Sequence, residues 1–431
     1  MSFLLGQMRH QVNGQKELTD HKDIIKLDAP SVVKIPLIVA NVSCEVYVKQ
    51  GDKVKVGTKI GARNDHFYCP IYSSVSGVVK GVEKLMHPTF KQVDHVVIEN
   101  DGKYEAETPL KPMDFEKATH KELEDFVKNL GLIGSGGAGF PTFVKYMMPE
   151  KIDTLIINAV ECEPYITSDY KGIYENLDFF VHGVRAMYKL SGGKEALVAI
   201  KENKKDLIPI LQNAFKPYEG IKVSLVPDVY PMGWERTLVY ELTKKRYVKL
   251  PSEVGCIVSN ATTAICLGKG LTTGMPNTQK LVTISGDGVN NPSNVLVYVG
   301  TPVKELIKAC GGYKGEDIVL IAGGPMMGQP MTTDEYVINP ACNAVTVLQD
   351  KEHEELACLR CGRCSDFCPS GLQPVRINNS NKLKDVDALA KLHVMDCIEC
   401  GLCSYVCPSK IEVTEGVKKA KKYFALKSKK K

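Results

Sequence analysis

Long apolar runs are missing from this sequence of 431 residues. No stretch approaches the roughly eighteen apolar residues that a membrane-spanning helix needs, so we do not expect the chain to cross a membrane by itself. Residues 1–16 are polar and interrupted by glycine and charged side chains, which excludes the apolar core of a secretory signal. Both absences predict a cytoplasmic protein.

A surplus of positive charge spread over the whole chain is also missing. The net charge is +5, but residues 411–431 hold eight lysines and two glutamates, which leaves the rest of the chain near −1. Nucleic-acid binding needs a distributed basic face, so that class of function is excluded. The basic tail is either a contact for an anionic membrane surface or an acidic partner, or a solvated, frayed terminus.

Cysteine, by contrast, is abundant for a cytoplasmic protein, with 15 residues. Eight of them crowd between positions 358 and 407. Seven are scattered: Cys44, Cys69, Cys162, Cys256, Cys266, Cys310 and Cys342. In a reducing compartment, such crowding indicates metal binding rather than disulfide bonds. Most of the scattered cysteines are expected to be small buried apolar residues.

The crowded cysteines form two copies of the motif C-x2-C-x2-C-x3-C-P. The first copy is Cys358, Cys361, Cys364 and Cys368, followed by Pro369; the second is Cys397, Cys400, Cys403 and Cys407, followed by Pro408. This spacing is typical of [4Fe–4S] clusters, and in two-cluster proteins the fourth cysteine binds the other cluster. Structural zinc sites use two separated pairs of ligands and give a third, evenly spaced cysteine no role.

We therefore expect two clusters with exchanged fourth ligands. The first takes Cys358, Cys361, Cys364 and Cys407, and the second takes Cys397, Cys400, Cys403 and Cys368. Between the copies, apolar residues recur at a helical period, and the gap is longer than a hairpin ferredoxin uses. A helical two-cluster ferredoxin module is predicted.

A glycine-rich segment, "GLIGSGGAGFPTFVK" at residues 131–145, is the second informative motif. Glycines let a backbone approach a ligand closely and turn N–H groups toward a phosphate. An apolar strand at 154–160 and the acidic segment "ECEPYITSD" at 161–169 follow. A glycine loop, a buried strand and polar groups at its carboxyl end indicate a nucleotide or flavin crevice, with a structural glycine turn as the alternative.

Two further regions predict small β domains. Residues 30–100 alternate apolar and polar side chains between glycine turns, as in a barrel-sandwich hybrid of the biotinyl or lipoyl kind. Its hairpin tip at 73–77 lacks the lysine that carries a cofactor in such domains, so a structural or docking role is expected. Residues 279–330 show two strands, a helix and a further strand, an order that suits a β-grasp fold.

Five segments carry a resemblance to a known family: "GSGGAGFPTFVK", "IINAVECEPYITSD", "SGDGVNNPSNVLVYVGTPVKELI", "GGPMMG" and the doubled cysteine motif. In this order they closely resemble the RnfC subunit of the Rnf electron-transport complex, from about residue 30 to residue 412. The flavin part is also similar to the NADH-oxidising flavoprotein subunit of respiratory complex I. The resemblance implies non-covalently held FMN, NADH as a candidate hydride donor, and two [4Fe–4S] clusters that relay single electrons.

Carried over by motif, the resemblance implies FMN contacts at Gly134, Gly136, Gly137, Lys145, Asn158 and Glu161. Lys145 would offer its charge to the phosphate or the ring, and Asn158 a hydrogen bond to the flavin. Glu163 is similar to the acidic residue near the nicotinamide. The segments "YPMGWERT" and "SNATT" add Tyr230, Gly233, Glu235, Asn260 and Thr263 as further candidates. Hydride transfer demands no side-chain acid or base, so no catalytic residue is assigned.

Two departures from the family pattern bear on NADH binding. Trp234, the only tryptophan of the chain, stands where RnfC proteins usually have a small glycine. An indole beside the flavin ring would stack where nicotinamide binds; packing of the indole under the loop is the alternative. The N-terminal arm also lacks the His-Pro pattern associated with the membrane-complex protein. Both departures favour a soluble relative.

The predicted fold is a multidomain α/β and β protein, and the length of the chain favours roughly two to four domains. The expected segments are an N-terminal arm at 1–28, a barrel-sandwich hybrid at 29–105, an FMN- and NADH-binding α/β domain at 106–278, a β-grasp domain at 279–330, a linker at 331–350, an α-helical two-cluster ferredoxin domain at 351–412 and a basic tail at 413–431.

The expected function is electron transfer between NADH, FMN and a partner protein through two [4Fe–4S] clusters, as an oxidoreductase subunit of an Rnf-type NADH:ferredoxin complex. Two alternatives stay open: a soluble relay to a reductase such as proline reductase or cobalamin reductase, and a flavin-free cluster carrier or scaffold. The expected location is the cytoplasm, or the cytoplasmic face of the cell membrane through protein contacts and the basic tail.

Overall fold

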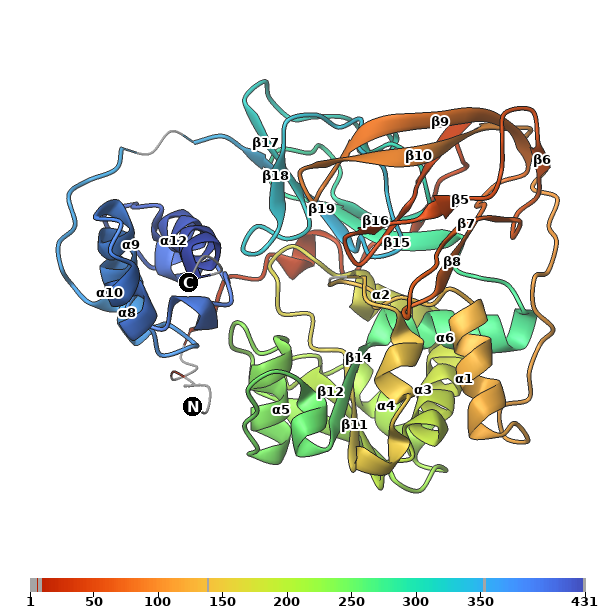
Figure 1. Ribbon diagram of the computed structural model, residues 1–431, viewed down its shortest axis with the longest axis horizontal. Helices are drawn as coiled ribbons and strands as arrows, with labels where there is room; N and C mark the ends of the chain where they lie inside the picture. Colours follow the sequence, from red (N-terminus) through yellow and green to blue (C-terminus); the bar gives the residue numbers. More distant parts are fainter. Residues whose placement is uncertain (1–5, 7–9, 138, 352–353, 429–431) are drawn as a thin grey trace.

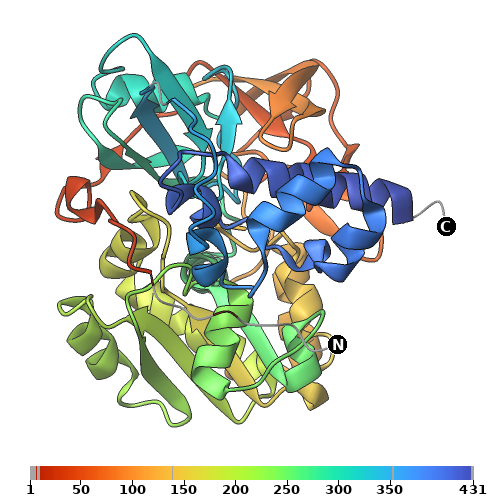
Figure 2. The ribbon, with the colours of Figure 1, turned by 90° about the vertical axis from the view of Figure 1, so that its left-hand side faces the viewer.

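The structure is a computed structural model that describes residue 6 and residues 10–137, 139–351 and 354–428. Figure 1 shows two β domains at the top, an α/β domain beneath them and a helical module, coloured blue, to one side. Figure 2, turned by 90°, shows this module in front of the junction between the β domains and the α/β domain. The chain therefore forms four domains, with the helical module against the junction of the other three.

The barrel-sandwich hybrid consists of short strands in three small sheets, ordered β2-β10-β9-β6, β5-β7-β8 and β3-β4. The strands are β2 Val32–Pro36, β3 Ile38–Val39, β4 Val42–Ser43, β5 Glu45–Val46, β6 Lys53–Val54, β7 Lys59–Arg63, β8 Cys69–Tyr72, β9 Gly77–His87 and β10 Lys91–Asn100. Residues 73–77 at the hairpin tip are buried, and Ser74 Oγ donates to Val299 O of the neighbouring β domain at 2.6 Å. The tip is thus a packing surface between domains.

A parallel four-stranded sheet, ordered β13-β12-β11-β14, forms the centre of the α/β domain. Its strands are β11 Thr154–Asn158, β12 Glu195–Lys201, β13 Ile221–Val226 and β14 Cys256–Asn260; its helices are α1 His120–Asn129, α2 Ser168–Glu175, α3 Leu177–Ser191, α4 Leu207–Phe215, α5 Glu235–Thr243 and α6 Ala261–Thr273, with 3-10 turns Thr142–Tyr146, Pro149–Lys151 and Pro251–Val254.

Apolar side chains point from both faces of this sheet. Leu155 and Ile157 of β11 belong to one core with α3 and α6, whereas Ile156 belongs to a second core with α5. A strand that is buried on both faces has a continuous apolar sequence, as "TLIIN" does. Asn158 and Asn260 end β11 and β14 in register, so they stand side by side at the carboxyl edge, where open α/β sheets bind ligands.

The second β domain has a six-stranded sheet, ordered β1-β16-β15-β19-β17-β18. Its elements are β1 Ile25–Lys26, β15 Gln279–Ser285, β16 Ser293–Tyr298, α7 Val303–Ala309, β17 Ile318–Ala322, β18 Gln329–Met331 and β19 Ala344–Gln349. The structure corrects the predicted linker at 331–350, because β19 lies in the middle of the sheet, between β15 and β17. Val345 and Val347 are fully buried, so the domain extends to the end of β19.

The C-terminal module is helical, as the spacing of its apolar residues predicts. Its elements are α8 Arg363–Asp366, α9 Pro374–Lys382, α10 Val386–Lys391, the 3-10 turn Val394–Asp396, α11 Leu402–Tyr405 and α12 Val413–Ser428. The basic tail predicted at 413–431 is corrected over its described part, because α12 buries Val413, Val417 and Ala420 in the core of the module. Apolar residues four and three positions apart form one helix face, and the lysines occupy the others. No helix among the described residues is long and apolar enough to cross a membrane.

The predicted N-terminal arm is built into the other domains. His10 O accepts a hydrogen bond from Tyr230 N at 2.9 Å, and Gly14 O accepts one from Tyr165 N at 2.6 Å. After the 3-10 turn Lys16–Leu18, β1 pairs in parallel with β16 at the edge of the second β domain. The arm therefore joins the α/β domain to the second β domain.

Candidate functional site

The two cysteine motifs fold into two matching turns. The third residue of each motif, Arg360 in the first copy and Glu399 in the second, has a positive φ, of 55° and 57° respectively. Their N–H groups donate to Sγ of Cys358 and Cys397, both at 3.4 Å. Such N–H groups are the donors that tune cluster potentials. The repeat in the sequence is thus also a repeat in the backbone.

The glycine in each motif has the same role in both copies. Gly362 and Gly401 have φ values of 78° and 80° and directly precede the short helices α8 and α11. Backbone in this left-handed region favours glycine. The two motifs therefore share the same backbone conformation at this position.

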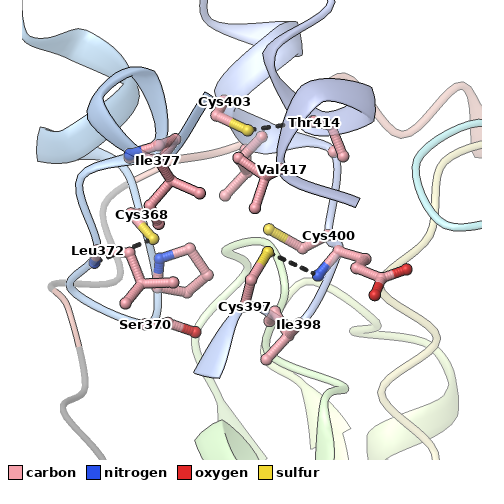
Figure 3. A pocket seen from close by; sticks show the side chains of 15 residues that line it. Cys368, Ser370, Leu372, Ile377, Cys397, Ile398, Cys400, Cys403, Thr414 and Val417 are labelled. Carbon is pink, nitrogen blue, oxygen red and sulfur yellow. Dashed lines mark hydrogen bonds between the residues drawn. The ribbon is translucent and has the colours of Figure 1, made fainter. Parts of the chain in front are cut away.

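Four cysteines line one cavity in the helical module: Cys368, Cys397, Cys400 and Cys403. Figure 3 shows their sulfur atoms facing a shared space. Cys368 comes from the first motif and the other three from the second, which is the combination predicted for the second cluster. Among the described residues, no three His, Cys, Asp or Glu side chains lie as ligands of a single metal ion would.

Hydrogen-bond donors and apolar side chains complete this cavity. Leu372 N donates to Cys368 Sγ at 3.3 Å, and Thr414 Oγ1 lies 3.1 Å from Cys403 Sγ. Ile377 and Val417 supply apolar walls. Four cysteines with N–H donors and apolar neighbours fit an iron–sulfur cluster.

The cysteines predicted for the first cluster lie nearer the surface. Cys358 and Cys361 are exposed, and Cys364 and Cys407 are half-buried. Residues 358–363 are exposed without interruption. The two predicted cluster sites therefore differ in access to solvent. None of the four cysteines of the second set is fully exposed, whereas two of the first set are.

The glycine loop forms a tight turn beside open space. Gly134 N donates to Phe140 O at 2.9 Å and closes the turn. A Cβ atom at Gly137 would meet nothing within 4 Å, so this side of the loop is open. Ser135 N donates to Thr263 Oγ1 at 3.0 Å, which holds the loop against the first turn of α6. Gly136, with φ of 71°, donates from its N–H to Ala341 O of the second β domain at 3.0 Å.

Asn158 and Asn260 are both engaged at the carboxyl edge of the sheet. Asn158 Nδ2 donates to Gly233 O at 2.8 Å. Asn260 caps α6 by accepting from Thr262 N, and its Nδ2 donates to Asp169 Oδ2 at 2.7 Å. Asp169 is buried and was not among the predicted site residues, although it ends the acidic segment that the sequence analysis quoted.

Glu161 has a carboxylate oxygen without a partner. Its Oε1 accepts from Asp169 N at 2.7 Å, whereas its Oε2 is buried and has no hydrogen bond among the described residues. Burial raises the pKa of this carboxyl group. The residue also has a positive φ of 42°, a conformation that places its side chain beside the strand end. An unpartnered buried acceptor is a place where a ligand donor fits.

Lys16 holds the acidic segment in place, and no pattern in the sequence predicted this role. Its ammonium donates to Glu161 O at 3.0 Å, to Glu163 O at 2.7 Å and to Ile166 O. Burial lowers its pKa, and the nearby Glu161 carboxylate opposes that effect. Its position in a polar arm far from the glycine motif offered no signal in the sequence.

Glu163 lies at the contact with the second β domain. Met326 N donates to its Oε2 at 3.2 Å, and burial raises the pKa of its carboxyl group to about 7. Lys145, a predicted contact of the phosphate or ring, instead donates its amine to Val258 O of β14 at 2.7 Å. The structure therefore places Glu163 at the domain junction and Lys145 against the sheet backbone.

The segment 230–235 links the α/β domain to the helical module. Tyr230 OH donates to Cys400 O at 2.9 Å, and Tyr230 packs with Leu402 in a shared apolar cluster. Glu235 accepts from Tyr247 OH at 3.1 Å, and the Arg236 guanidinium lies 5.7 Å from the ring centre of Trp234. The second cysteine set is thus in direct contact with the carboxyl edge of the sheet.

Four parts of the chain match known protein families. Residues 10–103 match the RnfC barrel sandwich hybrid domain, 127–269 the Nuo51 FMN-binding domain, 281–330 the SLBB domain, and 350–408 the 4Fe-4S dicluster domain. These matches confirm the predicted fold class.

Curated relatives cover most of the chain. The RnfC-type subunit of the proton-translocating ferredoxin:NAD(+) oxidoreductase complex of Clostridium ljungdahlii is 36% identical, over 83% of this chain and 80% of the relative. The corresponding protein of the Na(+)-translocating ferredoxin:NAD(+) oxidoreductase complex of Acetobacterium woodii is 32% identical, over 85% of both. A crystal structure of an NAD+-reducing [NiFe]-hydrogenase in the H2-reduced state shares the fold, with a TM-score of 0.50 and 17% identity over 73% of this chain and 63% of that one.

An FMN-binding domain and a dicluster domain in one chain make this a flavo-iron–sulfur protein of the electron-transferring class. The domain order and the identity to the curated relatives are more specific. The chain belongs to the RnfC family of ion-translocating oxidoreductase complexes, as the resemblance of its motifs implied. The FMN-binding domain also disfavours the alternative of a flavin-free cluster carrier.

Proposed function

We propose that this chain transfers electrons between NADH and a partner protein, through FMN and two [4Fe–4S] clusters, as part of an Rnf-type oxidoreductase complex. The observation that carries this proposal is the hydrogen bond of Tyr230 to Cys400, which joins the carboxyl edge of the sheet to the four-cysteine cavity. When bound, FMN supplies the exchange between a hydride and single electrons, and the clusters supply the one-electron relay.

The carboxyl edge of the sheet fits a flavin nucleotide. The open side of Gly137 leaves room, and Glu161 Oε2 offers a buried acceptor to a hydroxyl or N–H group. The N–H groups of Gly134 and Gly136 already donate to Phe140 O and Ala341 O, so Gly137 and the N-terminus of α6 would hold the phosphate. Asn158, beside Glu161 at the strand end, would hold the ring.

The eight motif cysteines fit two clusters with different surroundings. The set of Cys368, Cys397, Cys400 and Cys403 would hold an inner cluster next to the flavin crevice. The set of Cys358, Cys361, Cys364 and Cys407 would hold an outer cluster near the surface. Electrons would therefore cross between flavin and partner by way of the inner and then the outer set.

NADH would enter on the side of Glu163 and the segment 230–235. The contact between the Trp234 ring and the Arg236 guanidinium supports packing of the indole against its own helix, α5, over stacking in the nicotinamide position. A Trp234→Gly variant tests this point: packing on α5 predicts an NADH dissociation constant equal to that of wild type. If the variant instead bound NADH markedly more tightly than wild type does, the indole would be blocking the nicotinamide pocket.

We further propose a peripheral position on the cytoplasmic face of the membrane, held by other subunits. The relatives are named as subunits of ion-translocating complexes. Lys419 and Lys422, on the exposed side of α12, would support contact with an acidic partner or anionic lipid. A soluble relay to another reductase predicts instead that the protein purifies without membrane subunits from its own cells.

The direct test is anaerobic titration of the reconstituted protein with NADH. We expect flavin absorbance to bleach and reduced clusters to appear by electron paramagnetic resonance. A Cys400→Ala variant should keep the flavin bleaching and lose the signal of the inner cluster. Failure of NADH to bleach the flavin in the wild-type protein would remove NADH from the proposal.

A further inference from the structure

The internal repeat of the helical module extends beyond the cysteines. The inner turn, at residues 397–403, and the outer turn, at residues 358–364, are each followed by a helix, α12 and α9 respectively. Aligned on the C-P-S that both copies share, the connecting segments read "CPSKIEVT" in the inner copy and "CPSGLQPV" in the outer copy. Thr414 and Val375 are therefore equivalent, each as the second residue of its helix. A hydroxyl in one copy replaces a methyl group in the other.

The Thr414 hydroxyl lies in the wall of the inner cysteine cavity. Its Oγ1 is 3.1 Å from Cys403 Sγ, and Thr414 is only 7% exposed. Figure 3 shows this contact as a dashed line. Cys403 is the third cysteine of its motif, and Cys364 is its counterpart in the outer turn. Since valine has no hydroxyl, Val375 cannot offer the same contact to the outer turn.

The direction of this hydrogen bond follows from its neighbours. Thr414 N donates to Ser404 Oγ at 2.9 Å, and Ser404 Oγ donates to Thr414 Oγ1 at 3.1 Å. A hydroxyl has one hydrogen to donate, so the hydrogen of Ser404 is used in this bond and that of Thr414 is left for Cys403 Sγ. A cysteine that binds a metal has lost its own hydrogen and can only accept. Thr414 is therefore the donor to Cys403.

A hydrogen bond to a ligand sulfur favours the more negative state of a cluster. Reduction adds one electron, and hydrogen bonds to the sulfurs and access to solvent both set the potential at which this happens. Burial opposes the added charge. Cys400 of the inner set is buried, whereas Cys358 and Cys361 of the outer set are exposed. The Thr414 hydroxyl therefore acts against a penalty that falls more heavily on the inner set.

We propose that Thr414 tunes the inner cluster: its hydroxyl donates to Cys403 Sγ and raises the reduction potential there, an adjustment that the outer copy lacks. This inference rests on the proposed assignment of the inner cysteine set to one cluster. It goes beyond that assignment, because it gives a residue that binds no cofactor a part in setting the potential at which the inner set takes up its electron.

The test is anaerobic potentiometry of the full-length protein with both clusters and FMN bound, with dithionite as the reductant. Electron paramagnetic resonance follows the clusters, and the signal that Cys400→Ala removes is assigned to the inner one. The test variant Thr414→Val installs the residue of the outer copy and keeps the shape of the side chain. Thr414→Ser keeps the hydroxyl. The matched control is Val375→Thr, which makes the reverse exchange at the equivalent position of the outer copy.

We expect Thr414→Val to lower the ratio of reduced to oxidised inner cluster about tenfold at a fixed potential, which equals a shift of about 59 mV to more negative values for a one-electron couple. The outer cluster of this variant should keep its wild-type potential. Thr414→Ser and Val375→Thr should both keep the wild-type potential of the inner cluster. Because dithionite supplies the electrons, the result does not depend on NADH.

Iron and sulfide content separates the outcomes. An unchanged inner potential in Thr414→Val, with full iron and sulfide, would overturn the proposal and leave the cluster assignment standing. An equal shift of the inner potential in Val375→Thr would also overturn it. Loss of iron from Thr414→Val but not from Thr414→Ser would mean that the hydroxyl retains the cluster instead of tuning it. Full iron in Cys400→Ala would refute the cluster assignment itself, and the role of Thr414 with it.

Discussion

Buried charges organise the carboxyl edge of the α/β sheet at the scale of single residues. The Lys16 ammonium satisfies three backbone carbonyls of the acidic segment, and Glu161 keeps one unpartnered oxygen among the residues that the structure describes. Burial of a polar or charged group without a hydrogen-bond partner costs free energy. Substitutions of these residues should therefore change the stability of the site.

Removal of the Lys16 amine should loosen the acidic segment. In Lys16→Met three buried carbonyls lose their donor, and each unsatisfied group costs about 1–3 kcal/mol before the segment relaxes. We expect a lower melting temperature and FMN retention reduced about tenfold, measured by flavin fluorescence after gel filtration. Lys22→Met is the matched control, because Lys22 is an exposed lysine of the same arm that donates to Pro292 O. A variant that keeps wild-type FMN and stability would contradict this role for Lys16.

Glu163 should make stability depend on pH. Its carboxyl group has a pKa of about 7 in the folded protein, because of burial, against 4.5 in the unfolded chain. The folded state binds more protons between these values, so the free energy of unfolding falls as pH rises from about 4.5 to about 7, by up to about 3 kcal/mol. Glu163→Gln should flatten this slope in melting temperatures taken across that range. The exposed Glu150→Gln should keep the wild-type slope; an unchanged slope in Glu163→Gln would rule out the assignment.

Helix α12 is a structural element of the inner cysteine cavity. Val413, Val417 and Ala420 pack into the core of the module, and Val417 also lines the cavity. The helix therefore closes the space around the inner cysteines, which explains why the lysine-rich segment is helical through Ser428.

A charge on the buried face of α12 should release the inner cluster. Val417→Asp places a carboxylate in an apolar cavity, a change that costs several kcal/mol, about 3 or more. We expect loss of about half of the bound iron and sulfide per chain, with the outer cluster retained. Lys419→Asp, on the exposed face of the same helix, should retain the full iron content. Full iron content in Val417→Asp would show that α12 does not close the cavity.

The arrangement of the domains decides which cysteine set lies against the α/β domain. The hydrogen bond from Tyr230 OH to Cys400 O and the contact of Gly401 with Met326 place the inner turn at the junction shown in Figure 2. The outer turn is exposed over residues 358–363.

Loss of the Tyr230 hydroxyl should weaken this domain contact without altering either domain. Tyr230→Phe keeps the ring and leaves Cys400 O without its donor, at a cost of about 1–2 kcal/mol. We expect cluster reduction after NADH addition to slow by up to about tenfold in stopped-flow experiments, while flavin bleaching keeps its rate. Tyr405→Phe, which removes the hydroxyl of a half-exposed tyrosine on α11, should react like wild type. Equal cluster reduction in Tyr230→Phe would mean that the hydroxyl does not couple the domains.

Local patterns predicted much of this protein. The cysteine spacing placed Cys368 with the second motif, and the structure brings these four thiols around one cavity. The glycine loop, the apolar strand and the acidic segment predicted a crevice at the carboxyl edge, where Asn158 and Asn260 now lie in register. These features are local in sequence or follow fixed spacings, so they can be recognised without the fold.

Features that depend on distant partners were missed. Strand β19 was predicted as linker because its apolar stretch is short, and it is a strand only through its pairing with β15 and β17. The buried role of Lys16 requires carbonyls about 150 positions later in the chain, at Glu161, Glu163 and Ile166. The segment that forms α12 was predicted as a basic tail because it is rich in lysine. Composition does not show which side of a helix a residue occupies, so the apolar face was missed.

By itself, the sequence determined the chemistry of this protein: eight cysteines at cluster spacing and a glycine loop before an acidic segment. Thiolates at fixed separations and bare glycines act through short-range geometry that a few residues encode. Only the tertiary structure decided which cysteine set adjoins the α/β domain and which is exposed, because domain packing covers one turn and leaves its repeat exposed. This arrangement depends on contacts between residues far apart in the chain, such as Tyr230 and Cys400, so no local sequence pattern predicts it.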